Sequence, residues 1–154
     1  MANSLYAPDM AAPTSLEEVQ REFEAYEVLS DDPKIERNRL LIALANTLEP
    51  MPDALKTDST LVRGCNASVW VYPLPSSGSD RLHFLADSNS DLTKGIIALI
   101  LLTVQDKSAR EILDIDIEKS LAPLSLSQHF TSLRTSGLKN MVLKIRETAE
   151  RLAG

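Results

Sequence analysis

The spacing of apolar residues predicts a helix near the start of the chain. Between residues 15 and 29 they recur three or four positions apart, which places them on one helical face. The residues on this face are Leu16, Val19, Phe23 and Tyr26. Thr14 and Ser15 each stand three residues before a Glu, which is the spacing of a capping box. We therefore expect the first helix over about Ser15–Leu29.

Two further helices follow from similar signals. Asp31 and Asp32 supply caps and Pro33 suits a first helical turn, so a second helix is expected from there to Glu49–Pro50. This helix is expected to pair with the first. Near the end of the chain the periodic residues are Leu138, Met141, Val142, Ile145, Ala149 and Leu152. The last helix is therefore expected after the segment 132–137.

The middle of the chain has the pattern of a small antiparallel sheet. Residues 69–72 (VWVY) and 81–86 (RLHFLA) favour strands. The turn-forming cluster 75–80 between them predicts that these two strands pair. Residues 60–62 can add a short edge strand. Together these segments predict a small antiparallel three-stranded sheet.

The apolar run 95–104 (GIIALILLTV) predicts a helix that is buried almost all round. It follows a stretch rich in capping residues, and Ser108 with Glu111 then opens a short helix. Helices, a small meander and further helices indicate the α+β class, with the sheet packed against helices. Residues 1–13 are expected to form a flexible leader, and residues 14–154 a single domain.

Composition narrows the function classes. The 154-residue chain has a formal net charge of −6 and no block of Lys and Arg, so no nucleic-acid partner is expected. The apolar run 95–104 is too short to span a bilayer, which needs about 20 residues, so no membrane partner is expected. The first residues lack the basic start and long apolar run of a secretory signal, and a cytoplasmic location is therefore expected.

Cys65 is the only cysteine in the chain. A single cysteine excludes an intramolecular disulfide and cysteine-rich zinc or iron–sulfur sites within one chain. It lies between the expected edge strand and the next strand, so we expect it on a turn. Two interpretations are open: Cys65 is a small hydrophobic side chain, or it is a reactive thiol on a tight Gly64 turn whose thiolate Arg63 favours.

Other side chains that could carry chemistry have simpler interpretations. His83 is expected to face solvent from a strand, Trp70 to lie in the core, and Asp87 to lie in a capping or solvated loop. His129 precedes a loop that contains Arg134 and could act with the groups that this loop faces. Arg134 is expected just before the last helix, where the helix dipole disfavours a cation, which suggests a neighbouring carboxylate or sulfur anion. Two histidines without neighbouring carboxylate pairs give no reason to expect a metal site.

Three blocks of the chain resemble the SufE family of cysteine desulfuration proteins: 64–70 (GCNASVW), 86–96 and 128–138 (QHFTSLRTSGL). The resemblance covers the chain from about Ser15 to its end. It implies the SufE/NifU (IscU-like) fold and a role in sulfur mobilisation for iron–sulfur cluster assembly. It places the sulfur acceptor, a cysteine persulfide intermediate, at Cys65. The supporting positions in the three blocks are Gly64, Asp87, His129 and Arg134.

The sequence departs from the family's pattern at three places. The hydroxyl that commonly stands two residues after the cysteine is replaced by Ala67, and a hydroxyl is found instead at Ser68. The common Asp-Ser-Asp sequence ends in Asn89, which removes one negative charge. The usual Pro-Ser before the arginine is Ser132–Leu133. None of these departures affects Cys65.

The resemblance also implies a partner and a mechanism. A SufS/CsdA-type cysteine desulfurase, which contains pyridoxal phosphate, would take sulfur from free cysteine and hold it as a persulfide. The Cys65 thiolate would attack the outer sulfur of that persulfide, by the logic of thiol–disulfide exchange. The chain would then be an activator and sulfur carrier without a cofactor or metal of its own, not a stand-alone enzyme. An iron–sulfur scaffold complex is a further expected partner.

Two alternatives remain open. One is an adaptor of the same fold that binds a desulfurase or scaffold without carrying sulfur. The other is a small thiol enzyme, peroxide-reactive or hydrolytic, that turns over a small substrate with no partner present. The sequence leaves open which desulfurase paralogue is the partner, what accepts the sulfur downstream and whether Cys65 is exposed. It also leaves open whether the chain is a monomer or a homodimer.

Overall fold

The computed structural model describes residues 13–62, 68–75, 81–124 and 132–153, except for the side chains of Pro75 and residues 132–138. The first half contains α1 (Leu16–Leu29), α2 (Pro33–Ala45), the 3-10 helix η1 (Asp53–Leu55), β1 (Leu61–Val62), β2 (Val69–Pro75) and β3 (Arg81–Ser88). The second half contains α3 (Asp91–Val104), β4 (Lys107–Ser108), α4 (Ala109–Asp114), α5 (Ile117–Leu121), the 3-10 helix η2 (Ala122–Leu124) and α6 (Ser132–Ala153).

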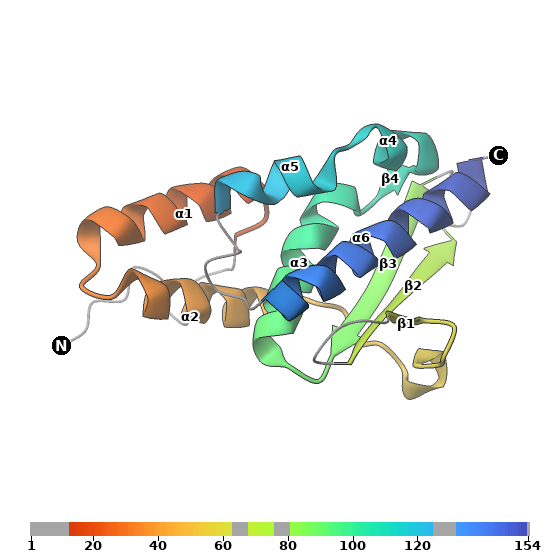
Figure 1. Cartoon of the computed structure of the whole chain (residues 1–154), viewed down its shortest axis with the longest axis horizontal. Helices are drawn as coiled ribbons and strands as arrows, with labels where there is room; N and C mark the ends of the chain where they lie inside the picture. Colours follow the sequence, from red (N-terminus) through yellow and green to blue (C-terminus); the bar gives the residue numbers. More distant parts are fainter. Residues whose placement is uncertain (1–12, 63–67, 76–80, 125–131, 154) are drawn as a thin grey trace.

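The first helices begin at the caps that the sequence predicts. The Ser15 hydroxyl accepts a hydrogen bond from the Glu18 N–H at 3.2 Å and caps α1. Asp32 accepts from the Ile35 N–H at 3.3 Å and caps α2, whose first turn holds Pro33. The two helices lie side by side as an antiparallel pair, as predicted (Figure 1).

The sheet has four antiparallel strands in the order β1-β2-β3-β4. The sequence predicts three, and β4 is missed because two residues are too few to show an alternating pattern. The Gln105 side chain, just before β4, bonds the backbone of Phe84 in both directions: its oxygen accepts from the Phe84 N–H at 2.7 Å, and its nitrogen donates to the Phe84 carbonyl at 2.9 Å. Part of the backbone hydrogen bonding at this edge of β3 is therefore made by a side chain.

One face of the sheet supplies the core. Val69, Val71, Phe84 and Ala86 alternate on this face and join a single cluster of buried side chains from the helices. α3 contacts β3, while α6 contacts β1 and β2 and lies across the sheet in Figure 1. On the opposite face, two side chains of the connection between α2 and β1 contact the sheet: Glu49 bonds His83, and Lys56 lies over the Trp70 ring.

Two predictions about elements need correction. α6 begins at Ser132, so the segment 132–137 is helical and not a loop. The sequence did not show this because the apolar periodicity starts only at Leu138, and because Gly137 disfavours a helix by about 1 kcal/mol. Trp70 is half-buried and lies on the sheet face away from the main core, because strand residues alternate and both of its neighbours belong to that core.

Candidate functional site at the β1–β2 connection

Cys65 and Gly64 belong to the connection between β1 and β2, and both lie outside the described residues. The two strands on either side are antiparallel neighbours, with Val62 paired to Val69. The chain therefore leaves β1 and enters β2 at the same end of the sheet. The flanking strands are those that the sequence predicts, and the position of Cys65 on a turn stays a prediction.

The β2 side of this connection is fixed to the segment before α3. The Ser68 N–H donates to the Asn89 side-chain oxygen at 3.1 Å, and the Asn89 N–H donates to the Ser68 carbonyl at 3.4 Å. Since Val69 pairs with Ser88, this reciprocal contact continues the β2–β3 register by one residue. Asn89 is followed by Ser90, whose hydroxyl caps α3. The end of the connection is thus tied to both the sheet and a buried helix.

An ion-pair cluster lies beside this anchor. Asp87, which is opposite Trp70 in the β2–β3 ladder, binds Lys56 at 2.8 Å and Lys94 at 3.5 Å between charged atoms. The Lys56 ammonium also lies 5.3 Å from the centre of the Trp70 ring, within cation–π range. The interpretation of Asp87 as a cap or solvated loop residue is wrong, because its side chain is only 20% exposed and is on β3. No sequence pattern indicates Lys56, which lies between two elements without periodicity.

The pKa values of this cluster follow from its contacts. Burial alone would raise the pKa of Asp87, but the hydrogen bond from Lys56, the backbone N–H of Ser88 and the charges of both lysines lower it. The hydrogen bond to Asp87 raises the pKa of Lys56 above its ordinary value. Asp87 is therefore ionised and Lys56 is charged at neutral pH.

The remaining predicted positions lie on the C-terminal side. His129 is outside the described residues. Arg134 is in the first turn of α6, not in a loop before it. Its side chain is not among those that the structure describes. The argument from the helix dipole still applies to Arg134, because a cation in a first helical turn is disfavoured.

His83 is not the solvent-facing strand residue that the sequence suggested. Its Nδ1 lies 2.7 Å from an Asp106 oxygen, its Nε2 bonds Glu49, and its side chain is 25% exposed. Asp106 adopts a positive φ of 59°, a conformation that Asp tolerates better than most residues. Burial lowers the pKa of His83, but the two carboxylates outweigh it and the net shift is upward. These partners are far apart in sequence, so no local pattern could reveal them.

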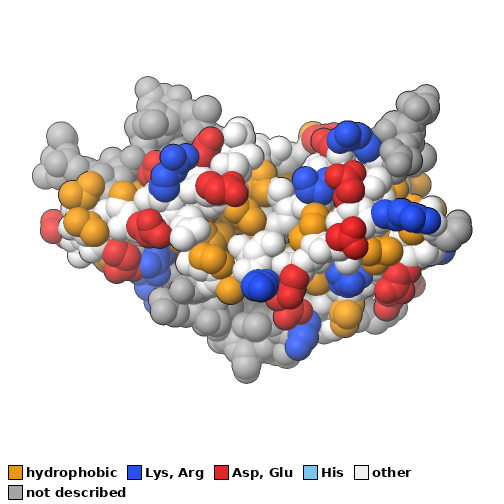
Figure 2. Space-filling model, turned by 90° about the horizontal axis from the view of Figure 1, so that it is seen from above, with side chains coloured by type: hydrophobic (Ala, Val, Ile, Leu, Met, Phe, Trp, Pro, Cys, Tyr) orange, Lys and Arg blue, Asp and Glu red, His pale blue; other side chains and the backbone are white. Residues whose placement is uncertain are grey.

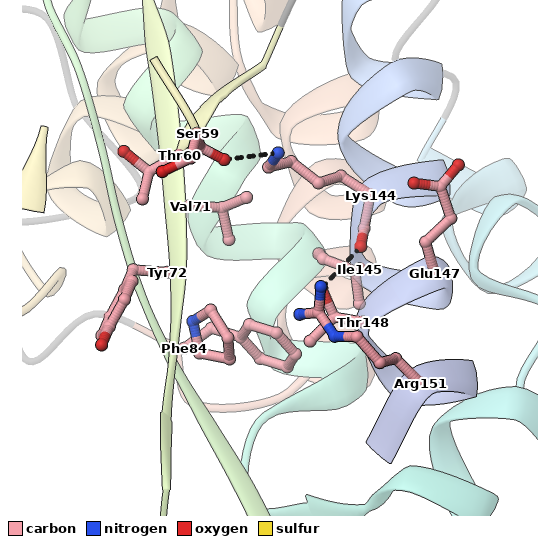
Figure 3. A pocket seen from close by; sticks show the side chains of 11 residues that line it. Ser59, Thr60, Val71, Tyr72, Phe84, Lys144, Ile145, Glu147, Thr148 and Arg151 are labelled. Carbon is pink, nitrogen blue, oxygen red and sulfur yellow. Dashed lines mark hydrogen bonds between the residues drawn. The ribbon is translucent and has the colours of Figure 1, made fainter. Parts of the chain in front are cut away.

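The described surface also has a hollow of about 290 Å³ between the sheet and α6. Val71 and Phe84 line it from the sheet, and Lys144, Thr148 and Arg151 line it from α6 (Figure 3). The Lys144 ammonium donates to the Ser59 carbonyl at 2.8 Å and so links α6 to the segment before β1. This hollow lies along the middle of β2, away from the residue where the Cys65 connection enters that strand.

Within the described ranges, no group of three or more His, Cys, Asp or Glu side chains is arranged to hold a metal ion. Nor does that part of the chain contain a helix of sufficient length and apolar character to cross a membrane.

Known proteins similar to this chain identify its family. The model of the family described as "SufE: Fe-S metabolism associated domain" matches residues 20–149. The chain belongs to the SufE family. A relative named "Cysteine desulfuration protein SufE", from Wigglesworthia glossinidia brevipalpis, is 33% identical over 114 residues, which cover 74% of this chain and 78% of the relative. The resemblance found in the sequence is confirmed. For this SufE-family chain it implies a role in sulfur transfer for iron–sulfur metabolism and interaction with a cysteine desulfurase.

A solved structure shows the same fold. It is the solution structure of a hypothetical protein from Thermus thermophilus, and it superimposes with a TM-score of 0.68 over 94% of this chain and 98% of that chain. The two sequences are 18% identical, so the likeness concerns the fold alone. The α+β prediction for this SufE-family chain is confirmed, with one more strand than expected.

Proposed function

We propose that this chain accepts persulfide sulfur from a SufS/CsdA-type cysteine desulfurase onto Cys65, stimulates that enzyme, and passes the sulfur on for iron–sulfur cluster assembly. The observation that carries the proposal is the combination of SufE-family membership with a single cysteine. That cysteine lies in a connection between two paired strands whose far end is anchored by Ser68 and Asn89.

Covalent geometry supports a well-placed acceptor. Three peptide units separate Cys65 from Ser68, and Cα atoms are about 3.8 Å apart along the chain. The Cα atom of Cys65 therefore lies within about 11 Å of that of Ser68, whatever path the connection takes. The connection that carries the proposed acceptor starts and ends at the end of the sheet where Lys56, Asp87 and Lys94 form their ion-pair cluster.

The proposed transfer needs one thiol on this chain. The Cys65 thiolate attacks the outer sulfur of the desulfurase persulfide, a new sulfur–sulfur bond forms on Cys65, and the desulfurase cysteine leaves as a thiolate. The reaction exchanges one sulfur–sulfur bond for another and needs no added oxidant or reductant. Its rate depends on the thiolate fraction and on access to Cys65.

The chain is, on this proposal, a carrier and activator with no cofactor of its own. The carbon–sulfur bond of free cysteine is broken by the pyridoxal phosphate of the desulfurase, and removal of the persulfide frees that enzyme for its next cycle. The proposed setting is the cytoplasm, with an iron–sulfur scaffold complex as a downstream partner.

Cys65→Ser tests the proposal in a desulfurase assay that measures alanine release from cysteine. We expect the variant to lose the stimulation given by the wild-type chain, because a hydroxyl side chain cannot form a persulfide. A matched variant, Ser68→Ala, keeps the thiol and is expected to retain stimulation. Full stimulation by Cys65→Ser would instead support the adaptor alternative and contradict the proposal.

A further inference from the structure

A second hollow, of about 430 Å³, lies where the connection from α4 to α5 faces the middle of α6. Its lining is apolar at depth, with Ile117 2% and Val142 7% exposed. Leu143, also in its lining, is 50% exposed and is one of the large apolar side chains that the fold leaves open. We call this hollow the α4–α6 groove.

The rim of the α4–α6 groove is acidic. Asp114, Asp116 and Glu118 line it and are exposed. In the part of the chain that the structure describes, no ion pair joins these carboxylates to a Lys or Arg. Asp116 has a structural role, because it accepts from the Lys119 N–H at 3.0 Å and caps α5. Asp114 and Glu118 have no such bond in the described structure.

Arg146 is the single cation among the described residues of the lining, and its hydrogen bonds connect the two walls of the groove. The guanidinium of Arg146 donates to the carbonyl of Ile115 at 3.1 Å and to that of Leu113 at 3.4 Å. These bonds tie the α4–α5 connection to α6 and hold the two walls together. The space-filling view from the side of α1, α4 and α5 shows acidic side chains beside hydrophobic ones (Figure 2).

We propose that the α4–α6 groove binds a segment of a partner protein that presents an apolar side chain flanked by Lys or Arg. The apolar floor and exposed Leu143 favour the burial of an apolar side chain. The carboxylates on the rim favour cationic flanks and steer them toward the groove.

Two other occupants fit the groove less well. Residues 1–13 of this chain contain no Lys or Arg and include Asp9, so this segment lacks the charge that the rim favours. A second copy of the chain would bring a net charge of −6 toward an acidic rim, which opposes association. A basic segment of a different protein is the occupant with matching charge.

The position of the groove suggests its use. Ile145 and Thr148 of α6 line the hollow against the sheet, whereas Val142, Leu143 and Arg146 line the α4–α6 groove on another side of the same helix. A partner held in the groove therefore lies on a different side of α6 from the hollow against the sheet. The proposed use, which rests on the proposed function, is the recruitment of a partner at a place separate from the sheet. Contact in one groove is small, so the binding is weak and reversible.

Backbone amide NMR shifts of the full chain, measured during titration with synthetic peptides, test the proposal. The probe is a short peptide with a central Leu between paired Lys residues. One control peptide has Ser in place of Leu, and another has Glu in place of Lys. We expect saturable shifts at residues 113–118 and 142–146 with the Leu and Lys peptide, and at least tenfold weaker binding of both control peptides.

Variants of the chain separate a local site from a general charge effect. Asp114→Lys with Glu118→Lys, and separately Leu143→Ser, are each expected to weaken binding of the Leu and Lys peptide at least tenfold. Glu24→Lys with Asp31→Lys changes the net charge by the same amount at exposed positions of the α1–α2 pair and is expected to leave binding within about twofold.

Three results would overturn the groove proposal: no shifts at residues 113–118 and 142–146, equal affinity for the Ser peptide, or equal weakening by the α1–α2 variant. The titration uses chain without sulfur on Cys65, so its failure would leave the proposed sulfur transfer intact. Failure of Cys65 to take up sulfur would likewise leave the peptide result unchanged.

Discussion

Asp87 shows how one side chain can organise the surroundings of the β1–β2 connection. It binds two lysines at once, lies opposite Trp70 and precedes the Ser88–Asn89 segment that anchors β2. Its carboxylate balances positive charge beside the end of the sheet from which the Cys65 connection starts. Each partly exposed ion pair contributes little to stability. We therefore expect Asp87 to affect the positions of the neighbouring side chains more than the free energy of unfolding.

Asp87→Asn is expected to lower the free energy of unfolding at neutral pH by about 1 kcal/mol or less. The folded-state pKa of Asp87 is below its ordinary value of 3.8, so its contribution is present above that value and is lost as pH falls through the folded pKa. Urea denaturation of the variant and the wild type at several pH values measures the difference. Exposed Asp31→Asn is the control. A difference that grows toward acid pH would contradict the assignment.

The contribution of His83 to stability has the opposite dependence on pH. Its pKa is raised in the folded state, so its contribution is complete below the ordinary value of 6.5 and is lost as pH rises through the folded pKa. His83→Gln is expected to cost about 0.5–1 kcal/mol of unfolding free energy at mildly acidic pH and less at alkaline pH. Because His129 is common to both proteins, the difference in denaturation free energy isolates His83. Wild type gaining stability over the variant as pH rises would refute the pairing with Glu49 and Asp106.

At the scale of residues, the sequence predicts local contacts and misses distant ones. Ser15 and Asp32 cap their helices as predicted, since each cap bonds a residue three positions on. The partners of His83 are 23 and 34 positions away, and no local pattern specifies such a contact. Asp87 was identified as a site residue only through the family resemblance, and its lysine partners were not predicted.

At the scale of elements, the contact between α2 and α3 depends on Gly95. A Cβ atom at this position would overlap the Leu41 carbonyl oxygen and lie 2.7 Å from the Leu41 carbonyl carbon. Both are backbone atoms and cannot move aside by a change of rotamer. The close approach of the two helices therefore requires glycine.

Gly95→Ala is expected to lower the free energy of unfolding by about 1–2 kcal/mol. Alanine favours a helix over glycine by about 1 kcal/mol, but overpacking against backbone costs typically about 1–3 kcal/mol and here requires α2 to shift. Thermal or urea denaturation measures the change. Leu41→Ala is not expected to rescue the variant, because the closest atoms are backbone. Equal or greater stability of Gly95→Ala would show that the helices separate without cost.

The sequence also predicts most elements, and its errors have a common cause. The long helices and the β2–β3 pair have periodic patterns or turn signals, and all of them are present. The two-residue β4 and the five-residue α5 are too short for a pattern, and the first turn of α6 has no apolar periodicity. These short elements depend on tertiary contacts, such as the packing of α4 on α6 that Arg146 bonds reinforce.

At the scale of the whole molecule, the connection that contains Cys65 starts and ends at one end of the sheet, and an acidic groove lies on another side of α6. The two ends of the Cys65 connection lie together because β1 and β2 are neighbouring strands. The sequence predicts this strand order in outline. The groove is formed by segments about 30 residues apart, as the Arg146 bonds to Leu113 and Ile115 show, and no sequence pattern could place them together. The proposed binding of a partner in the groove and the proposed transfer of sulfur can therefore be tested separately.

Intact-protein mass spectrometry with peptide mapping measures sulfur transfer to Cys65 itself. The chain is mixed with a SufS/CsdA-type desulfurase and free cysteine, and we predict the gain of one sulfur atom on the Cys65 peptide. This gain is expected to be removed by reductant and to be absent without the desulfurase. An unchanged mass beside a desulfurase that is active and binds the chain would contradict sulfur transfer to Cys65.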